Sequence, residues 1–305
     1  MESPTTLSKN ISLEKTIDIK NVIEEYKLIK PFGVDVERFF SNVEKVSLYK
    51  CNDTGYRFYY PFSLAGDDLF YQQLEKNPWY YMEWKWEHNI TERYLKTGDK
   101  VLEIGCAHGA FLEKIKQKVS LVEGLEMNTK ALQDCASKQI TAYNDTIENF
   151  SSKKSEFYNI VCSFQVLEHI ANVKSFIESS LSVLKPGGLL IISVPNNDCF
   201  FLKDKDFITN MPPHHMGLWN LNSLISLQKY FKLRIEDVHL EPLQKYHVGF
   251  AEKIAEGKLK IKLNKSFGFL APIIYKLVKR ISRFSVNSLS NYITGHTILV
   301  VFKKI

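Results

Sequence analysis

Cysteine is scarce in this sequence, and its spacing is uninformative. The 305 residues contain five cysteines, an odd number, and no two of them stand at the spacing of a metal-binding pair. We therefore expect reduced thiols, with neither a disulfide framework nor a bound metal. The five are Cys51, Cys106, Cys135, Cys162 and Cys199.

Long apolar stretches are missing as well. No uncharged apolar run approaches the roughly twenty residues that a membrane-spanning helix needs. The first twenty residues also lack the continuous apolar segment of a secretory signal. We therefore expect a cytoplasmic protein. We also expect the first twenty residues to be disordered.

Positive charge is concentrated in one part of the chain. The net charge is +6, but residues 243–290 contain ten Lys and Arg against two Glu, which leaves the rest of the chain slightly acidic. Such a local excess argues against a nucleic-acid surface spread over the whole protein. It favours one basic accessory segment.

From residue 100 onward, β-like runs alternate with helical patterns. This alternation predicts βαβ units, and hence a doubly wound α/β fold with a Rossmann-like, seven-stranded, mostly parallel sheet. The expected strands are 100–105, 120–127, 140–145, 158–165, 189–196, 233–242 and 296–305, and the expected helices are 110–119, 128–139, 175–188 and 223–231.

The flanking segments divide the chain into four parts. Residues 1–98 form an N-terminal leader with an aromatic-rich helical cap, and residues 99–242 form the α/β core. Residues 243–292 form a basic helical insertion, and residues 293–305 supply the last strand of the core.

The turn after the first core strand has lost most of its glycines. A dinucleotide-binding loop needs three, but here the positions are Gly105, Ala107 and Ala110. Glu103 would also repel a phosphate at this turn, whereas it would attract a cationic ligand. Further along, Glu126 ends the second strand, where an acidic side chain can accept both ribose hydroxyl protons. The pattern therefore favours a nucleoside ligand with a cationic end and no phosphate.

The segment from Lys100 to Asn196 resembles the class I S-adenosylmethionine-dependent methyltransferases, in particular their small-molecule branch. VLEIGCAHGAFL, GLEM, YNDTI, YNIVCSFQVLEHI and LKPGGLLIISVPN occur in the family's order and spacing. The resemblance implies that S-adenosylmethionine is the cofactor, with no metal at its site. It implies cofactor contacts from Glu103, Gly105, Cys106, Ala107, Gly109, Glu126, Met127, Asp145, Thr146, Phe164 and Gln165.

The acceptor side favours a small molecule. The Asp/Asn-Pro-Pro-aromatic turn of enzymes that methylate base amines is replaced by SFQVLEH, so nucleic acid is not expected as the substrate. The loop NMPPHHMGLWN resembles the histidine turn of the small-molecule branch, with His215, Trp219 and Asn220 at its key positions. We expect His215 to remove a proton from a hydroxyl acceptor, since histidine has a suitable pKa. His214, which we expect to point the other way along an extended segment, and His169 are the alternatives.

The leader resembles that of methyltransferases acting in bacterial surface-polysaccharide and sugar modification. Its segment 51–55 is similar to a C-x-x-C-G ribbon in which Thr54 replaces the second cysteine. The resemblance implies a saccharide acceptor. Aromatic residues of the cap are available to stack on a sugar ring or cover the cofactor, although such residues also build cores: Tyr71, Trp79, Tyr80, Tyr81, Trp84 and Trp86.

Several alternatives stay open. An N-methyltransferase, or an enzyme for a lipid-like or quinone-precursor acceptor, is the second hypothesis, and a cofactor-binding module without catalysis is the third. His108 points either at a ligand or at solvent. In the insertion, APIIYKLVKRISRF (271–284) predicts an amphipathic helix that lies on the core or contacts an anionic membrane, carrier or partner.

Overall fold

The computed structural model describes residues 1–28, 34–77, 82–199, 202, 208–267, 275 and 290–305. Its larger sheet has seven strands in the order β10-β11-β8-β7-β4-β5-β6. Five of them are parallel neighbours: β4 (Lys100–Ile104), β5 (Leu121–Leu125), β6 (Thr141–Tyr143), β7 (Tyr158–Phe164) and β8 (Leu184–Pro195). Between β8 and β10 (Leu233–Pro242), β11 (Thr294–Lys304) runs antiparallel to both. The predicted doubly wound, mostly parallel seven-stranded sheet is confirmed.

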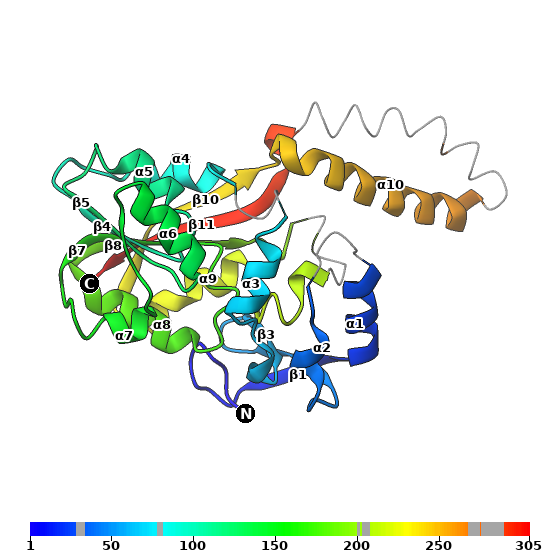
Figure 1. Cartoon of the computed structure of the whole chain (residues 1–305). Coiled ribbons are helices and arrows are strands. Elements are labelled where there is room, and N and C mark those ends of the chain that lie inside the picture. Colours follow the sequence, from blue (N-terminus) through cyan, green and yellow to red (C-terminus); the bar gives the residue numbers. More distant parts are fainter. Residues whose placement is uncertain (29–33, 78–81, 200–201, 203–207, 268–274, 276–289) are drawn as a thin grey trace.

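Alternating apolar residues place helices on both faces of this sheet (Figure 1). On β4, for example, Val101 packs toward α4 (Trp86–Glu92), α5 (Ala110–Ile115) and α6 (Thr129–Ser137). Its neighbour Leu102 packs into the opposite cluster, with α7 (Ile147–Phe150), α8 (Val173–Val183) and α9 (Leu221–Ser226). Because side chains alternate along a strand, each strand contributes to both cores.

The leader contains a second, antiparallel sheet that the sequence did not predict. Its order is β1 (Ile11–Ile17), β2 (Val46–Cys51), β3 (Arg57–Tyr60) and β9 (Gly217–Leu218). Since β1 pairs with β2 from Ile11 to Ile17, the expected disorder of the first twenty residues is wrong. Three helices pack on this sheet around their own core: α1 (Ile19–Leu28), α2 (Glu37–Phe40) and α3 (Asp68–Leu74).

This second sheet anchors the loop that carries the two adjacent histidines. β9 follows that loop and pairs with β3. The backbone N–H of Tyr59 donates to the Met216 carbonyl at 2.8 Å, and that of Gly66 donates to the Pro213 carbonyl at 2.9 Å. A Cβ on Gly217 would lie 2.1 Å from the Tyr56 hydroxyl, so glycine permits this close pairing. The leader therefore positions part of the candidate site.

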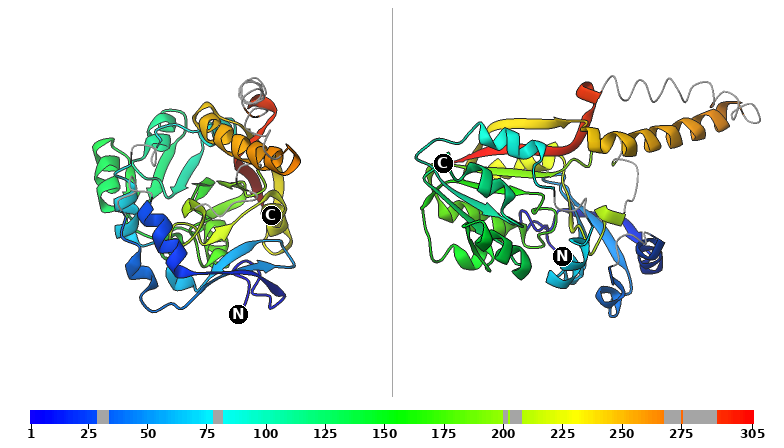
Figure 2. Two further views of the ribbon diagram at one scale, coloured as in Figure 1. Left: turned by 90° about the vertical axis from the view of Figure 1, so that its right-hand side faces the viewer. Right: turned by 45° about the horizontal axis from the view of Figure 1, so that its top comes forward.

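One long helix leaves the body of the molecule. Figure 2 shows that α10 (Lys245–Phe267) projects away from the sheet. Near the start of this helix, Ala251 and Ile254 pack against Cys199, Leu202 and Leu243. The helix predicted for 271–284 falls outside the described residues, apart from Tyr275. No helix in the described part of the chain is long and apolar enough to cross a membrane. Short 3-10 turns complete the fold at Phe62–Leu64, Ile208–Asn210, Leu227–Lys229 and Ser290–Tyr292.

Candidate active site

One cavity of about 1240 Å³ opens at the carboxyl ends of β4, β5 and β7. In an open α/β sheet this edge is where ligands bind. Its walls also include parts of α3, the first turns of α10 and the histidine loop. All but one of the predicted site residues line it: Glu103, Gly105, Cys106, Ala107, Glu126, Met127, Asp145, Thr146, Phe164, Gln165, His169, His214 and His215.

The exception is Gly109. It has a left-handed φ of 71° and caps the start of α5. A Cβ there would lie 2.9 Å from both Cys135 Sγ and Ile140 Cδ1, so Gly109 is packed behind the loop. The predicted contact of Gly109 with the cofactor is therefore not supported by the structure. Its role is to let the loop pack closely on α6.

Glu103 presents a buried carboxylate to the cavity. The residue is 4% exposed, and its Oε2 has no hydrogen-bond partner among the described residues. Burial, and next the charges of Cys135 and Glu126, raise its pKa well above the usual value of 4.5. A buried carboxyl without a partner is costly, and an ammonium group would satisfy it. The arrangement fits the amino group of S-adenosylmethionine.

The turn after β4 brings backbone close to the cavity. A Cβ on Gly105, whose φ is +73°, would meet Val166 Cγ2 at 2.5 Å. Ala107 and Gln165 also line the cavity and adopt positive φ values of 45° and 56°. Left-handed conformations cost free energy for residues other than glycine and cluster at functional sites.

Glu126 does more than the sequence predicted. Its Oε2 accepts the Ala107 N–H at 2.8 Å, while Oε1 accepts the Met127 and Asn128 N–H groups at 2.9 Å each. A carboxylate offers about four acceptor positions, so capacity for a ribose hydroxyl remains. Burial raises the pKa of Glu126, and the backbone donors oppose that shift. The side chain therefore shapes the β4 loop and also faces the ligand space.

Asp145 and Thr146 stand at the start of α7. Asp145 Oδ2 pairs with Lys153 Nζ at 2.5 Å, and Oδ1 accepts the Thr146 N–H at 3.0 Å. The pairing with Lys153 lowers the pKa of Asp145. Thr146 caps α7 through the Asn149 N–H. Both residues thus have structural partners in addition to facing the cavity.

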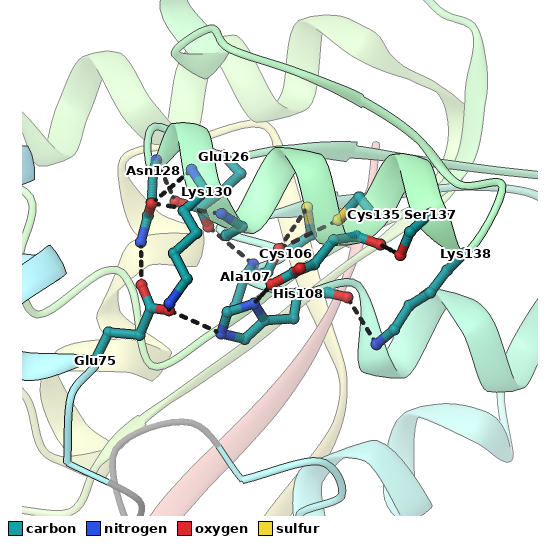
Figure 3. Close-up of polar contacts among 12 residues, drawn as sticks. Glu75, Cys106, Ala107, His108, Glu126, Asn128, Lys130, Cys135, Ser137 and Lys138 are labelled. Atoms are coloured by element: carbon teal, nitrogen blue, oxygen red, sulfur yellow. Dashed lines mark hydrogen bonds and ion pairs between the residues drawn. The ribbon is translucent and has the colours of Figure 1, made fainter.

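His108 lines the cavity, and both of its ring nitrogens face carboxylates. Its Nδ1 lies 2.6 Å from Asp134 Oδ2 and its Nε2 lies 3.6 Å from Glu75 Oε1. Figure 3 shows that Glu75, which follows α3, also receives Asn128 Nδ2 at 2.6 Å and Lys130 Nζ at 2.9 Å. We call this group the Glu75 clasp, because it joins the leader to the β4 loop and α6.

The two adjacent histidines share one direction, contrary to the prediction. Pro212 and Pro213 form a turn in which the N–H groups of His214 and His215 both point to the Met211 carbonyl, at 3.0 and 3.1 Å. The two rings consequently stack, with centroids 4.4 Å apart. The expectation of opposite directions assumed an extended segment, whereas the chain here is turned.

His169 completes a group of three imidazoles, with ring centroids 4.9 Å from His215 and 5.1 Å from His214. Burial lowers the pKa of His169 to about 4 and that of His214 to about 3. Burial, followed by the neighbouring histidines, also lowers the pKa of His215 well below 6.5. All three imidazoles are therefore neutral at pH 7.

Sequence reasoning missed Glu168 as a site residue. It is 1% exposed and lines the cavity, and its Oε2 has no partner among the described residues. Burial raises its pKa to about 8. The signal was present in the segment Leu167-Glu168-His169, of which only His169 was considered as a site residue. Other lining residues that the sequence did not single out include Lys85, Glu87, His88, Tyr246, His247 and His296.

Two groups of aromatic residues play different parts. Among the cap aromatics, Tyr71 lines the cavity, whereas Trp84 and Trp86 pack on the core beside α5. Trp79, Tyr80 and Tyr81 lie outside the described residues. Trp219 is fully buried against Tyr56, at 4.1 Å between ring centroids, and Asn220 caps α9. These last two residues hold the histidine loop rather than face a ligand.

Comparisons with known proteins identify the family of this chain. The model of the methyltransferase domain family matches residues 79–235, slightly more than half of the chain. The ubiquinone biosynthesis O-methyltransferase of Vibrio vulnificus (strain YJ016) is 29% identical over 107 residues, which are 33% of this chain and 46% of that protein. The enzyme of the same name from Photorhabdus laumondii is 30% identical over 107 residues, covering 33% and 45%.

The chain spans about half the length of the curated relatives it matches. Among solved structures, a SAM-dependent methyltransferase from Archaeoglobus fulgidus is similar with a TM-score of 0.49 and 16% identity, covering 71% of this chain and 92% of that one. The matched residues 79–235 contain the strands β4 to β8 and the cofactor-side cavity wall. The chain therefore belongs to the methyltransferase domain family, within the class I S-adenosylmethionine-dependent methyltransferases.

Proposed function

We propose that this protein is an S-adenosylmethionine-dependent O-methyltransferase that acts on a saccharide or a sugar-linked small molecule. The observation that carries the proposal is one cavity lined by two unlike sets of groups. One set includes the Glu103 carboxyl, whose Oε2 has no partner among the described residues, and the other is three neutral histidines. The first suits a cationic cofactor, and the second suits a hydroxyl group that must lose a proton.

On the cofactor side, the chain's own residues bind and orient. S-adenosylmethionine supplies a methyl group on a positively charged sulfur. Glu103 accepts its ammonium, Gly105, Cys106 and Ala107 contact it through backbone, and Glu126 accepts ribose hydroxyls. Met127, Asp145 and Thr146 border the adenine, and Phe164 with Gln165 closes the methionine end. Holding the reacting groups in line is the main contribution of such a site to the rate.

On the acceptor side, His215 is the proposed proton acceptor. Its Nδ1 lies 2.9 Å from Asn210 Oδ1, an oxygen that can only accept, so Nδ1 carries the hydrogen and Nε2 carries the lone pair. A neutral imidazole in this tautomer accepts a proton from a hydroxyl as the new O–C bond forms. His169 and His214 are the alternative acceptors, since each faces the same cavity.

A phenolic acceptor is the second candidate. The curated relatives are named ubiquinone biosynthesis O-methyltransferases, which favours a quinone precursor with an aromatic hydroxyl. An amine acceptor is the remaining alternative. It needs no base if it arrives unprotonated, and it would leave the histidine cluster without a proton to accept.

The domain division and location are part of the same proposal. The unit 99–242 holds the cofactor, the leader 1–98 and the insertion 243–292 cover the acceptor side, and 293–305 completes the sheet. We propose that the enzyme works in the cytoplasm, where its cofactor is made.

A labelled-methyl assay tests this function. The protein is incubated with S-adenosylmethionine carrying a labelled methyl group and with a nucleotide-linked hexose, a catechol or a primary amine. We expect label on a hydroxyl oxygen, and His215→Asn should lower turnover about a hundredfold while S-adenosylhomocysteine still binds. His239→Ala, on β10 outside the cavity, is the control. Label found on the amine alone, or full turnover by His215→Asn, would contradict the proposal.

A further inference from the structure

The three histidines at the acceptor end form a compact cluster. His169 follows β7, and His214 and His215 lie in the turn before β9, so the cluster unites the core with the loop that the leader anchors. One ring nitrogen from each histidine lies within 4.8 Å of those of the other two. His214 and His215 are 8% and 7% exposed, and all three line the cavity.

The hydrogen bonds of the cluster fix the same tautomer on all three rings. His169 Nδ1 lies 2.5 Å from the His214 carbonyl oxygen, and His214 Nδ1 lies 2.7 Å from the Thr209 carbonyl oxygen. His215 Nδ1 lies 2.9 Å from Asn210 Oδ1. Because each partner atom is an acceptor, each Nδ1 carries the hydrogen and each Nε2 carries the lone pair.

The orientation of the Asn210 amide is itself fixed. Its Nδ2 donates to Asn197 Oδ1 at 2.6 Å, and Asn197 Nδ2 donates to the Trp219 carbonyl at 2.9 Å. This chain ends on backbone, so the oxygen of Asn210 must face His215. The tautomer of His215 is therefore determined by the fold rather than chosen freely.

We propose that the Nε2 atoms of His169, His214 and His215 bind a divalent transition-metal ion of the zinc class, with an open position toward the cavity. Neutral imidazoles that donate Nδ1–H to carbonyl oxygens are the usual form of metal-binding histidines. Three histidines with one open position make a catalytic rather than a structural zinc site. The Glu168 carboxyl lines the same cavity and its Oε2 has no partner among the described residues, and a bound cation would favour its ionised form. The earlier expectation of no metal rested on the spacing of the cysteines and on the family resemblance, and neither argument considered a histidine site.

Binding requires the cluster to contract. Zinc–nitrogen bonds of about 2.0–2.1 Å in a tetrahedron place the ligand nitrogens about 3.3 Å apart, whereas the ring nitrogens of the cluster lie within 4.8 Å of one another. The three Nε2 atoms must therefore come closer together for an ion to bind. The histidine turn supplies two of the three ligands. The set would come together if that turn moved toward His169 and the His214 and His215 rings, now stacked at 22° between their planes, rotated so that both Nε2 atoms faced one ion.

This inference deepens the proposed function and rests on it for its chemical purpose. The open position would hold the acceptor hydroxyl oxygen and lower its pKa. The O–H bond breaks with its proton passing to water, the O–C bond forms, and the C–S bond breaks. With an ion bound, His215 would be a metal ligand and would no longer be the proton acceptor proposed above, while the transfer of a methyl group to a hydroxyl oxygen would stay the same.

Cobalt binding tests the site without any activity measurement. Full-length protein is treated with a chelator, titrated with Co²⁺ and followed by visible d–d absorption. We expect one Co²⁺ per chain, displaced by Zn²⁺. His169→Gln and His215→Gln should lose the spectrum, whereas His239→Ala should keep it. Asn210→Ala, which frees the His215 ring, should weaken Co²⁺ binding by about 10- to 100-fold.

S-adenosylhomocysteine binding, measured on every variant, shows that the fold persists. If the intact protein binds S-adenosylhomocysteine but gives no Co²⁺ spectrum, or if the His→Gln variants keep that spectrum, the metal site is refuted. That result leaves O-methyl transfer intact. Conversely, a normal Co²⁺ spectrum in a protein that labels no hydroxyl acceptor refutes the proposed function and retains the metal site.

Discussion

At the scale of single residues, Gly105 has the most restrictive environment in the β4 loop. Its φ of +73° is unfavourable for other residues, and an added Cβ would lie 2.5 Å from Val166 Cγ2. We therefore predict that Gly105→Ala lowers the free energy of unfolding by about 1–3 kcal/mol and weakens cofactor binding. Denaturant titration and calorimetry measure the two effects.

Gly98→Ala is the matched control for this change. An added Cβ at Gly98 meets nothing within 4 Å, and its φ is not in the left-handed range. It should therefore leave both measurements nearly unchanged. Equal behaviour of the two variants would show that the close approach of Gly105 to Val166 does not matter.

The sequence indicated which residues face the cavity but not how they are held. Glu103 and Glu126 could be predicted because strand ends and their acidic residues follow a regular spacing. The three backbone hydrogen bonds to Glu126 depend on the path of the β4 loop. The shared direction of His214 and His215 was mispredicted, because the segment was taken to be extended, whereas Pro212 and Pro213 form a turn.

At the scale of elements, the Glu75 clasp connects α3 to α6. Burial raises the pKa of Glu75, but the hydrogen bonds and charges of Lys130, Asn128 and His108 outweigh it and leave the pKa below 4.5. Glu75→Gln should therefore loosen the leader over the cavity. We predict severalfold faster amide hydrogen exchange in α3, since local opening becomes easier.

Glu92→Gln provides the control for the clasp. Glu92 also pairs with a lysine, Lys118, but its side chain is 30% exposed on α4, compared with 8% for Glu75. Its replacement should not change exchange in α3. Unchanged exchange in Glu75→Gln would mean that the core of the leader, rather than the clasp, keeps α3 in place.

Glu241, at the end of β10 where it pairs with β11, makes the stability of the fold depend on pH. This residue is fully buried, with Oε1 accepting the Tyr246 hydroxyl and Oε2 accepting the Thr297 N–H, both at 2.9 Å. Burial, and next the charge of Glu87, raise its pKa to about 7. The folded state thus favours the protonated form, so this contribution to stability is complete below pH 4.5 and is lost as the pH rises through 7.

Glu241→Gln should remove that loss. When the pH rises from 5 to 8, the free energy of unfolding of the intact protein should fall by about 3 kcal/mol more than that of the variant. Denaturant titration at both pH values measures this difference. Glu236→Gln, at an exposed position on the same strand, controls for general charge effects. The same change of unfolding free energy with pH in the intact protein and in Glu241→Gln would contradict this role of Glu241.

The elements themselves were predicted unevenly. The core strands and helices follow clear periodicities, and α6 begins at Asn128 as expected. The leader sheet was missed because β1 and β2 are far apart in sequence and β9 lies beyond residue 215, so no local pattern joins them. Non-local pairing of this kind depends on tertiary packing rather than on propensity.

At the scale of the whole molecule, α10 projects from the core with a basic surface. Lys253, Lys262 and Lys265 are exposed along it, while Tyr246, His247 and Phe250 at its base line the cavity. We propose that the insertion contacts an anionic membrane or carrier. Recovery with anionic liposomes should then exceed recovery with neutral ones and decline with salt, because surface attraction is screened.

Charge-reversal variants test whether liposome binding depends on the lysines of α10 or on the overall positive charge of the protein. Lys253→Glu combined with Lys262→Glu should abolish the difference between anionic and neutral liposomes, whereas Lys45→Glu, an exposed residue of the leader, should not. Equal recovery of the intact protein with both kinds of liposome would leave the insertion as a solvated helix.

The account as a whole depends on one cavity that binds S-adenosylmethionine between Glu103 and Glu126. Calorimetric titration with S-adenosylhomocysteine tests this most directly. We predict one bound molecule per chain, with a binding free energy that is weaker by roughly 1–3 kcal/mol in Glu126→Ala. Glu113→Ala should bind like the intact protein, because the Glu113 side chain lies on α5 outside the cavity lining. Absence of binding, or equal affinity in the intact protein and Glu126→Ala, would contradict the account.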